Sequence, residues 1–139
     1  MIFKTFLTKP YFQINLIFAG ILMMIFLYSG IFSASHNNYP IPSNYTKLTG
    51  KKTVSTGLSR CFSEIIRGRL KSAKEYNPYG IGIFLFFLIQ LLIRISLLIF
   101  YSKLNKYEHI VIIADSILSV VLFILFFRPV ILAVYDLIF

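Results

Sequence analysis

The sequence predicts an all-α integral membrane protein with three transmembrane helices and two short amphipathic helices between the first and the second. Hydrophobic residues make up 58% of the 139-residue chain, well above their share in an ordinary soluble domain. The apolar residues fall in three long blocks and do not alternate at a helical or strand period. The basic residues gather mainly between the first two blocks, as is typical of a loop that flanks membrane spans.

Each apolar block is long enough to cross a bilayer, which takes about 20 helical residues. We expect the three spans at 11–33, 80–101 and 110–127. With spans and connections counted, residues 1–139 form a single membrane domain. The connection 102–109 is short and polar, which predicts that the second and third helices are antiparallel neighbours. Arg128 and Pro129 should stop or kink the third helix, and the sequence leaves open whether 130–139 continues it.

The segment 34–79, between the first two spans, is polar and basic. It starts with a stretch rich in turn-forming residues and then shows apolar residues at helical spacing. A single face of this first short helix would carry Leu58, Phe62, Ile65 and Ile66. Ser55 or Thr56 could cap its start, Gly68 could end it, and a second short helix could follow over 69–76. We expect both helices to lie at the membrane surface or to fold back against the spans.

The distribution of basic residues predicts how the chain is oriented. Eight of the 14 Lys and Arg residues lie between the first and second spans, Arg128 lies on the same side, and only four lie on the other side. The positive-inside rule then places the 34–79 connection and the C-terminus in the cytoplasm, with the N-terminus outside. Because these cations flank apolar spans, we expect anionic membrane lipid to balance the net charge of +9, and we expect no nucleic acid partner.

Two charged residues fall inside the predicted spans and need partners. A lone Arg94 or Asp115 would cost roughly 2.5 to 3.5 kcal/mol in hydrocarbon. The two residues lie at nearly the same distance from the middle of the 102–109 connection, so we expect them to pair across the antiparallel helices. Two alternatives are contact with a partner subunit and a place in an ion or proton path. That path would be lined by Gln90, Ser116 and Ser119.

A second group of polar residues lies around the start of the first short helix. Gly57, Ser59, Arg60 and Asn77 could offer backbone N–H groups, a hydroxyl and a guanidinium to a phosphate or carboxylate, such as a lipid headgroup. The alternative is structural. Ser59 would help to satisfy the helix start, Arg60 would reach the membrane interface, and Asn77 would cap the second short helix.

An ordered set of residues between Thr53 and Gly80 carries a family resemblance. The set consists of Gly57, Ser59, Arg60, Gly68, Ala73, Asn77 and Pro78. It resembles the pattern of a bacterial membrane family known as domain of unknown function 2752, which reads Cys-Pro-x-Cys-Gly-x-Thr-Arg, an apolar helix, Gly, Ala and Asn-Pro before a span. The resemblance implies a membrane architecture of this kind and a bacterial origin, and it implies no activity. Thr53 and Thr56 stand where the family has cysteines, so it implies no metal or redox role here.

The sequence shows no catalytic, metal-binding or nucleotide-binding motif. His36 and His109 have no second ligand at metal-binding spacing, and Cys61 is the single cysteine. We therefore predict a small non-enzymatic membrane protein without a cofactor. It would act as a subunit or scaffold that binds a partner protein or anionic lipid, as a homo-oligomer or within a membrane complex. The alternative is an oligomeric channel, pore or small transporter that uses Arg94 and Asp115. A lipid-modifying or lipid-moving activity centred on Arg60 ranks third.

Overall fold

The computed structural model describes residues 7–33 and 55–138. Over these ranges the chain is all-helical, with five α-helices, one short 3-10 turn and no strand. Three of these helices are long and apolar enough to cross a membrane, and two short helices lie between the first and the second. The predicted fold class is confirmed. The turn-rich stretch that opens the 34–79 connection lies outside the described residues.

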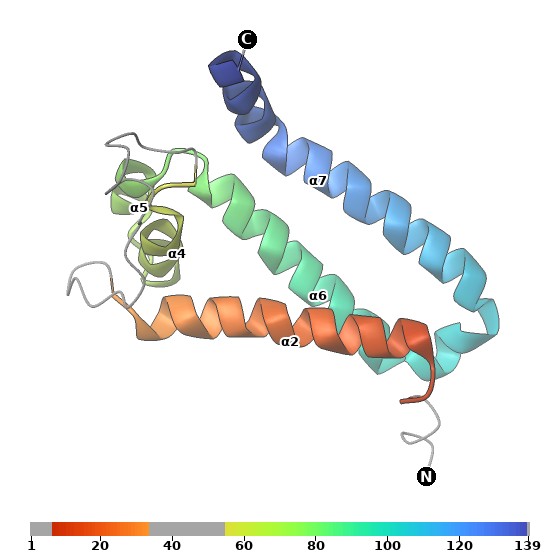
Figure 1. Ribbon diagram of the computed structural model, residues 1–139. Helices are drawn as coiled ribbons and strands as arrows, with labels where there is room; N and C mark the ends of the chain where they lie inside the picture. The colour runs from red at the N-terminus through yellow and green to blue at the C-terminus, as the bar shows by residue number, and fades with distance from the viewer. Residues whose placement is uncertain (1–6, 34–54, 139) are drawn as a thin grey trace.

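The three long helices match the predicted spans closely at their starts and less closely at their ends. They are α2 (Pro10–Ile31), α6 (Gly80–Leu104) and α7 (Glu108–Ile138). Of the two outcomes predicted at Arg128 and Pro129, a stop or a kink, the structure has the kink, because α7 continues through Pro129 beyond the predicted span end at 127. Figure 1 shows the last turns of α7 bent away from the rest of the helix, as expected where a proline interrupts the hydrogen-bond ladder. Residues 130–138 therefore continue the third helix beyond a bend.

The long helices pack mainly on α6. The short turn η2 (Asn105–Tyr107) reverses the chain, so that α6 and α7 run antiparallel, as the short connection predicted (Figure 1). Helix α2 lies across the C-terminal half of α6 (Figure 1). Near that crossing, the ring of Phe12 meets the ring of Tyr101 edge-on at a centroid distance of 5.1 Å. Helix α6 is therefore the central span.

The short helices α4 (Leu58–Ile66) and α5 (Leu70–Tyr76) fold back against the spans, one of the two arrangements that the sequence allowed. Helix α4 sits in the opening between α2 and α6 where these two spans diverge (Figure 1). The ring of Phe62 on α4 lies 5.3 Å from the ring of Phe84 and 5.9 Å from that of Phe87 on α6. These aromatic contacts anchor α4 to the central span.

Two glycines set the ends of α4. Gly57, with φ of 80°, is the N-cap and forms no side-chain cap bond, so the predicted cap at Ser55 or Thr56 is wrong. A Cβ atom at Gly57 would lie 2.3 Å from the carbonyl oxygen of Tyr76, so only glycine lets the start of α4 approach the end of α5 this closely.

Gly68, with φ of 76°, ends α4 as predicted. The Arg69 N–H donates to the carbonyl of Glu64 and the Gly68 N–H donates to that of Ile65, each at 2.9 Å. This pair of bonds is the Schellman arrangement that glycine commonly gives at a helix end. It turns the chain sharply from α4 into α5.

The buried side of α4 differs from the predicted apolar face. The buried positions are Cys61, Phe62, Ser63 and Glu64, whereas Ile66 is 42% exposed. A helix lying on the membrane would bury one apolar stripe. Helix α4 instead touches α2, α5 and α6 on several sides, and it therefore buries polar residues that find partners on those helices.

Candidate functional site

Arg94 and Asp115 form a buried ion pair between α6 and α7. Arg94 Nη1 donates to Asp115 Oδ2 at 2.7 Å, and Nη2 donates to Oδ1 of the same carboxylate. Both side chains are 9% exposed. The structure thus brings together the two charges that the sequence placed at equal depth. The two-point geometry is the one that best matches a guanidinium to a carboxylate.

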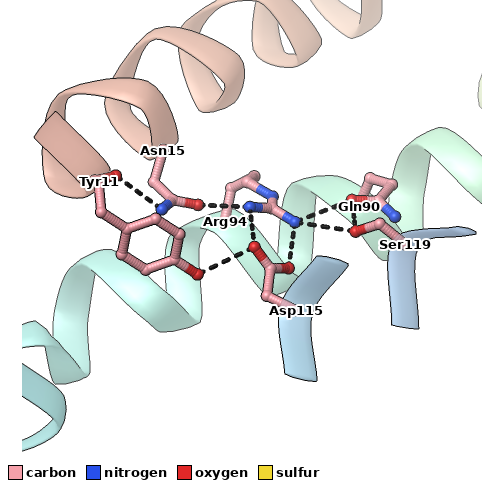
Figure 2. A network of polar contacts seen from close by, with 6 residues as sticks. All are labelled: Tyr11, Asn15, Gln90, Arg94, Asp115 and Ser119. Carbon is pink, nitrogen blue, oxygen red and sulfur yellow. Dashed lines mark hydrogen bonds and ion pairs between the residues drawn. The ribbon is translucent and has the colours of Figure 1, made fainter. Parts of the chain in front are cut away.

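Helix α2 joins this pair through two residues of its first turns (Figure 2). Arg94 Nη1 also donates to Asn15 Oδ1 at 2.6 Å, and the Tyr11 hydroxyl donates to Asp115 Oδ2 at 2.9 Å. Asn15 Nδ2 in turn donates to the Tyr11 carbonyl at 2.8 Å, which holds the amide in place. All three spans therefore meet in one cluster of polar contacts.

The other side of Arg94 is occupied by Gln90 and Ser119. Arg94 Nη2 donates to Gln90 Oε1 at 3.3 Å and to Ser119 Oγ at 3.1 Å. Among the described residues, Gln90 Nε2 is the one buried side-chain polar atom without a hydrogen-bond partner. Ser116, which the path hypothesis included, is exposed on α7 and takes no part in this cluster. We call Tyr11, Asn15, Gln90, Arg94, Asp115 and Ser119 the polar cluster.

The polar cluster is electrically balanced. One guanidinium meets one carboxylate, and neutral side chains take up the remaining hydrogen bonds of both. In a low-dielectric surrounding, removing either charge would leave the other unpaired, which is far more costly than keeping both. The arrangement is suited to fixing the register of three helices. Sequence reasoning did not assign Tyr11 and Asn15 to this cluster. The only sign of their role in the sequence is that both are polar residues within an otherwise apolar span.

The second candidate site, around Gly57, is held together largely by internal contacts. Asn77 is 2% exposed. Its Nδ2 donates to the Thr56 carbonyl at 3.0 Å, and its Oδ1 accepts the Tyr79 N–H at 2.9 Å. The side chain therefore ties the residues before α4 to those before α6. Asn77 is also the C-cap residue of α5, as the structural alternative predicted, and its backbone N–H donates to the Ala73 carbonyl at 3.1 Å. A ligand would have to displace these bonds to reach it.

Ser59 and Arg60 are the exposed members of the second candidate site. The Arg60 guanidinium lies over the ring of Tyr76 at 5.9 Å from its centroid, a cation–π arrangement. Gly57 approaches the backbone of the same Tyr76. The predicted residues thus gather around the end of α5, with Ser59 and Arg60 accessible to an anion and Asn77 enclosed.

Arg67 closes the C-terminal end of α2, a role that sequence reasoning missed. Its Nη1 donates to the Ser29 carbonyl at 3.2 Å and its Nη2 donates to the Gly30 carbonyl at 2.9 Å. Ser63 Oγ donates to the Phe32 carbonyl at 2.7 Å. The last carbonyls of a helix lack partners within the helix and carry partial negative charge, so a guanidinium there is doubly favourable.

Glu64 and Arg69 form a second ion pair, across the turn between α4 and α5. Arg69 Nε and Nη2 donate to the two carboxylate oxygens of Glu64 at 2.6 and 2.8 Å. The Glu64 side chain is 4% exposed and that of Arg69 is 47% exposed, so the carboxylate is buried while the guanidinium reaches the surface. The hydrogen bonds from Arg69 hold the pKa of the Glu64 carboxyl below its usual value.

The described part of the chain was searched for a metal-binding site and for a reactive thiol. It contains no group of three His, Cys, Asp or Glu residues that could hold a metal ion. Burial raises the pKa of the Cys61 thiol to about 11, which keeps it protonated and unreactive near neutral pH.

The chain was compared with protein-family models, curated proteins and solved structures. No protein-family model, no curated protein and no solved structure matches this chain.

Proposed function

We propose that this chain is a small non-enzymatic subunit or scaffold of a bacterial inner membrane, binding a partner protein or anionic lipid. The observation that carries the proposal is the uncovered surface of α7. None of the most apolar 18 residues of α7 is buried within the described chain, compared with 22% of the corresponding window of α2 and 28% of that of α6. A span with so little cover from its own chain is available for packing against another membrane helix.

The polar cluster supports a structural role for Arg94 and Asp115. Their charges cancel, and α2 and α6 supply most of the neutral partners. The pair therefore holds α7 at a fixed register against α6 while the opposite side of α7 faces outward. A fixed, rigid helix loses less freedom on binding a partner than a loose one does.

The proposal includes an orientation and a family. The excess of basic residues between α2 and α6 favours a cytoplasmic location for that connection and for the C-terminus. The resemblance to domain of unknown function 2752 favours a bacterial inner membrane. The residues that carry it have structural tasks in this chain, since Gly57, Gly68 and Asn77 shape the ends of α4 and α5.

Site-specific photocrosslinking tests the subunit proposal. A photoreactive phenylalanine analogue replaces Ile117 on α7 in one variant and Ile17 on α2 in the other, which are 60% and 61% exposed. We expect a protein adduct of defined mass at position 117 and lipid adducts alone at position 17. Lipid adducts alone at both positions would contradict the proposal. The mass of the intact complex in mild detergent then distinguishes a second copy from another protein.

The alternative is an oligomeric channel or small transporter built around the polar cluster. One observation favours it, the Gln90 Nε2 donor that lacks a partner in the described part of the chain, because a group of this kind can serve a passing ion or water. Ion flux through liposomes that contain the purified chain tests this function. Flux that disappears in Asp115→Asn, with normal folding yield, would support the channel and contradict the scaffold.

A further inference from the structure

An open groove lies where α2 and α6 diverge beneath α4. Its volume is about 530 Å³. Most of its wall is apolar and comes from three helices, through Ile21, Met24 and Ile25 of α2, Leu58 and Phe62 of α4, and Phe87 of α6. The groove lies apart from the polar cluster, whose α2 residues belong to the opposite end of that helix.

The groove extends from the end of the spans into the hydrocarbon region. Ile21 lies about 15 Å along α2 from its last residue, and Phe87 lies about 10 Å along α6 from its first. Both stretches belong to helices with the length and hydropathy of membrane spans. The hydroxyl of Ser29 on the wall donates back to the Ile25 carbonyl at 2.9 Å, so it offers no donor to an occupant. The part of an occupant that lies along this wall should therefore be apolar.

The enclosed part of the groove favours a slender occupant over a whole helix. Along the α2 wall, from Ile21 to Ser29, the helix advances about 12 Å. A volume of about 530 Å³ over that length corresponds to a cross-section of roughly 45 Å², about half or less of that of a helix with a diameter of about 10 to 12 Å. An extended peptide would leave backbone groups unpaired in hydrocarbon. A flexible hydrocarbon chain meets both conditions.

The end of the groove nearest α4 is polar, and the short helices α4 and α5 that pack together there carry an excess of basic residues. Tyr28 and Ser59 line that end with hydroxyl groups. Residues 55–79 contain five Lys or Arg and two acids, and one of these acids, Glu64, already pairs with Arg69. The exposed cations that remain there, which include Lys71 and Lys74, favour a negatively charged group.

We propose that the groove binds an acyl chain of an anionic phospholipid, with the headgroup at the basic end formed by α4 and α5. This inference specifies the lipid-binding part of the proposed function. The apolar wall of α2, α4 and α6 holds the chain, and the cations of α4 and α5 select the headgroup. Met24, unbranched and polarizable, lets the wall adapt to a flexible occupant.

A tryptophan reporter tests the proposal, because the chain contains no Trp of its own. Met24→Trp places the reporter at the groove and Leu125→Trp places a control on α7, at positions that are 70% and 64% exposed. Each variant of the full chain is reconstituted into vesicles that contain a small fraction of acyl-brominated anionic or zwitterionic phospholipid. Bromine quenches tryptophan on contact. We expect about a fivefold preference for the anionic lipid at Met24→Trp and none at Leu125→Trp.

Other outcomes would overturn the proposal. Equal quenching by the two lipids at Met24→Trp would mean ordinary surrounding lipid, and no quenching by either would mean that protein fills the groove. If Met24→Trp does not insert, Ile21→Trp on the same wall replaces it. The double variant Lys71→Gln and Lys74→Gln should remove the preference and keep the quenching by zwitterionic lipid. The crosslinking at Ile117 is an independent measurement. If the quenching experiment contradicts the lipid groove, the subunit proposal is unaffected, and if the crosslinking contradicts the subunit proposal, the lipid groove is unaffected.

Discussion

Removal of the Asp115 charge should weaken the packing of all three spans. In Asp115→Asn the Arg94 guanidinium keeps its charge but loses its counterion in a buried site. We expect a loss of about 3 kcal/mol in the free energy of unfolding, together with a lower yield of inserted protein. Chemical unfolding in detergent, followed by circular dichroism, measures the change.

Asp136→Asn is the matched control for this experiment, because Asp136 is exposed near the end of α7. It removes the same charge and should leave the unfolding curve unchanged within about 0.5 kcal/mol. Equal unfolding curves for the two variants would mean that the ion pair does not stabilise the helix register.

Gly80 is required by a close approach between α4 and α6. A Cβ atom there would lie 2.2 Å from the Cys61 sulfur, and Cys61 is fully buried. Gly80→Ala should therefore destabilise the fold by about 1–3 kcal/mol through overpacking. Gly20→Ala is the control, since nothing lies within 4 Å of its added methyl group. Combining Gly80→Ala with Cys61→Ala should restore part of the loss, and no restoration would contradict the overpacking explanation.

At the scale of the elements, α4 stabilises the end of α2. Arg67→Gln removes the guanidinium that binds the Ser29 and Gly30 carbonyls. We expect a loss of about 1–2 kcal/mol, the range for a charge at a helix C-terminus in a partly buried site. Arg60→Gln is the control, because Arg60 is exposed and lies over the Tyr76 ring. Equal effects in thermal unfolding would contradict a specific role for Arg67.

The Glu64–Arg69 pair predicts how the stability of the α4–α5 unit depends on pH. The folded-state pKa of Glu64 lies below its ordinary value of 4.5, so the folded state binds its proton less readily than the unfolded state. The resulting stability is complete above the ordinary pKa and is lost as the pH falls through the lower, folded-state value. Glu64→Gln should be less stable than the wild type at pH 7 and should approach it in acid. Thermal unfolding of the wild type and of Glu64→Gln across this pH range measures the difference in stability. A difference that does not change with pH would contradict this role of the Glu64 proton.

The long helices could be predicted from the sequence because each one satisfies a local condition, a block of apolar residues long enough for a bilayer. The Arg94–Asp115 contact could also be predicted, since a short connection fixes the relative depth of two antiparallel helices. The contribution of Asn15 could not, because the register of α2 against α6 depends on packing between segments 79 residues apart. The prediction of which residues α4 buries was wrong for the same reason. Its neighbours are three separate helices, and periodicity reports only one stripe.

At the scale of the whole molecule, polar contacts hold the spans near both of their ends. The polar cluster ties the start of α2 to α6 and α7, and Arg67 and Ser63 of α4 tie the end of α2 to the short helices. Between these points the contacts are apolar, and at one end the groove remains open. Asp115 and Ser119, in the half of α7 nearer η2, give the third span polar contacts with α6. The far half of α7 packs on α6 through the rings of Phe123 and Phe127 against that of Phe86.

The orientation of the whole molecule can be tested with single cysteines in a Cys61→Ala background. Lys103→Cys near η2 and Lys71→Cys on α5 are both exposed and lie at opposite ends of α6. Because most basic residues are retained in the cytoplasm, a membrane-impermeant maleimide added to intact spheroplasts should label position 103 and leave position 71 unlabelled until the membrane is opened. Labelling of position 71 alone would reverse the topology. The basic end of the groove would then face an outer leaflet, where the negative surface potential of the cytoplasmic leaflet no longer supplies the attraction for its cations.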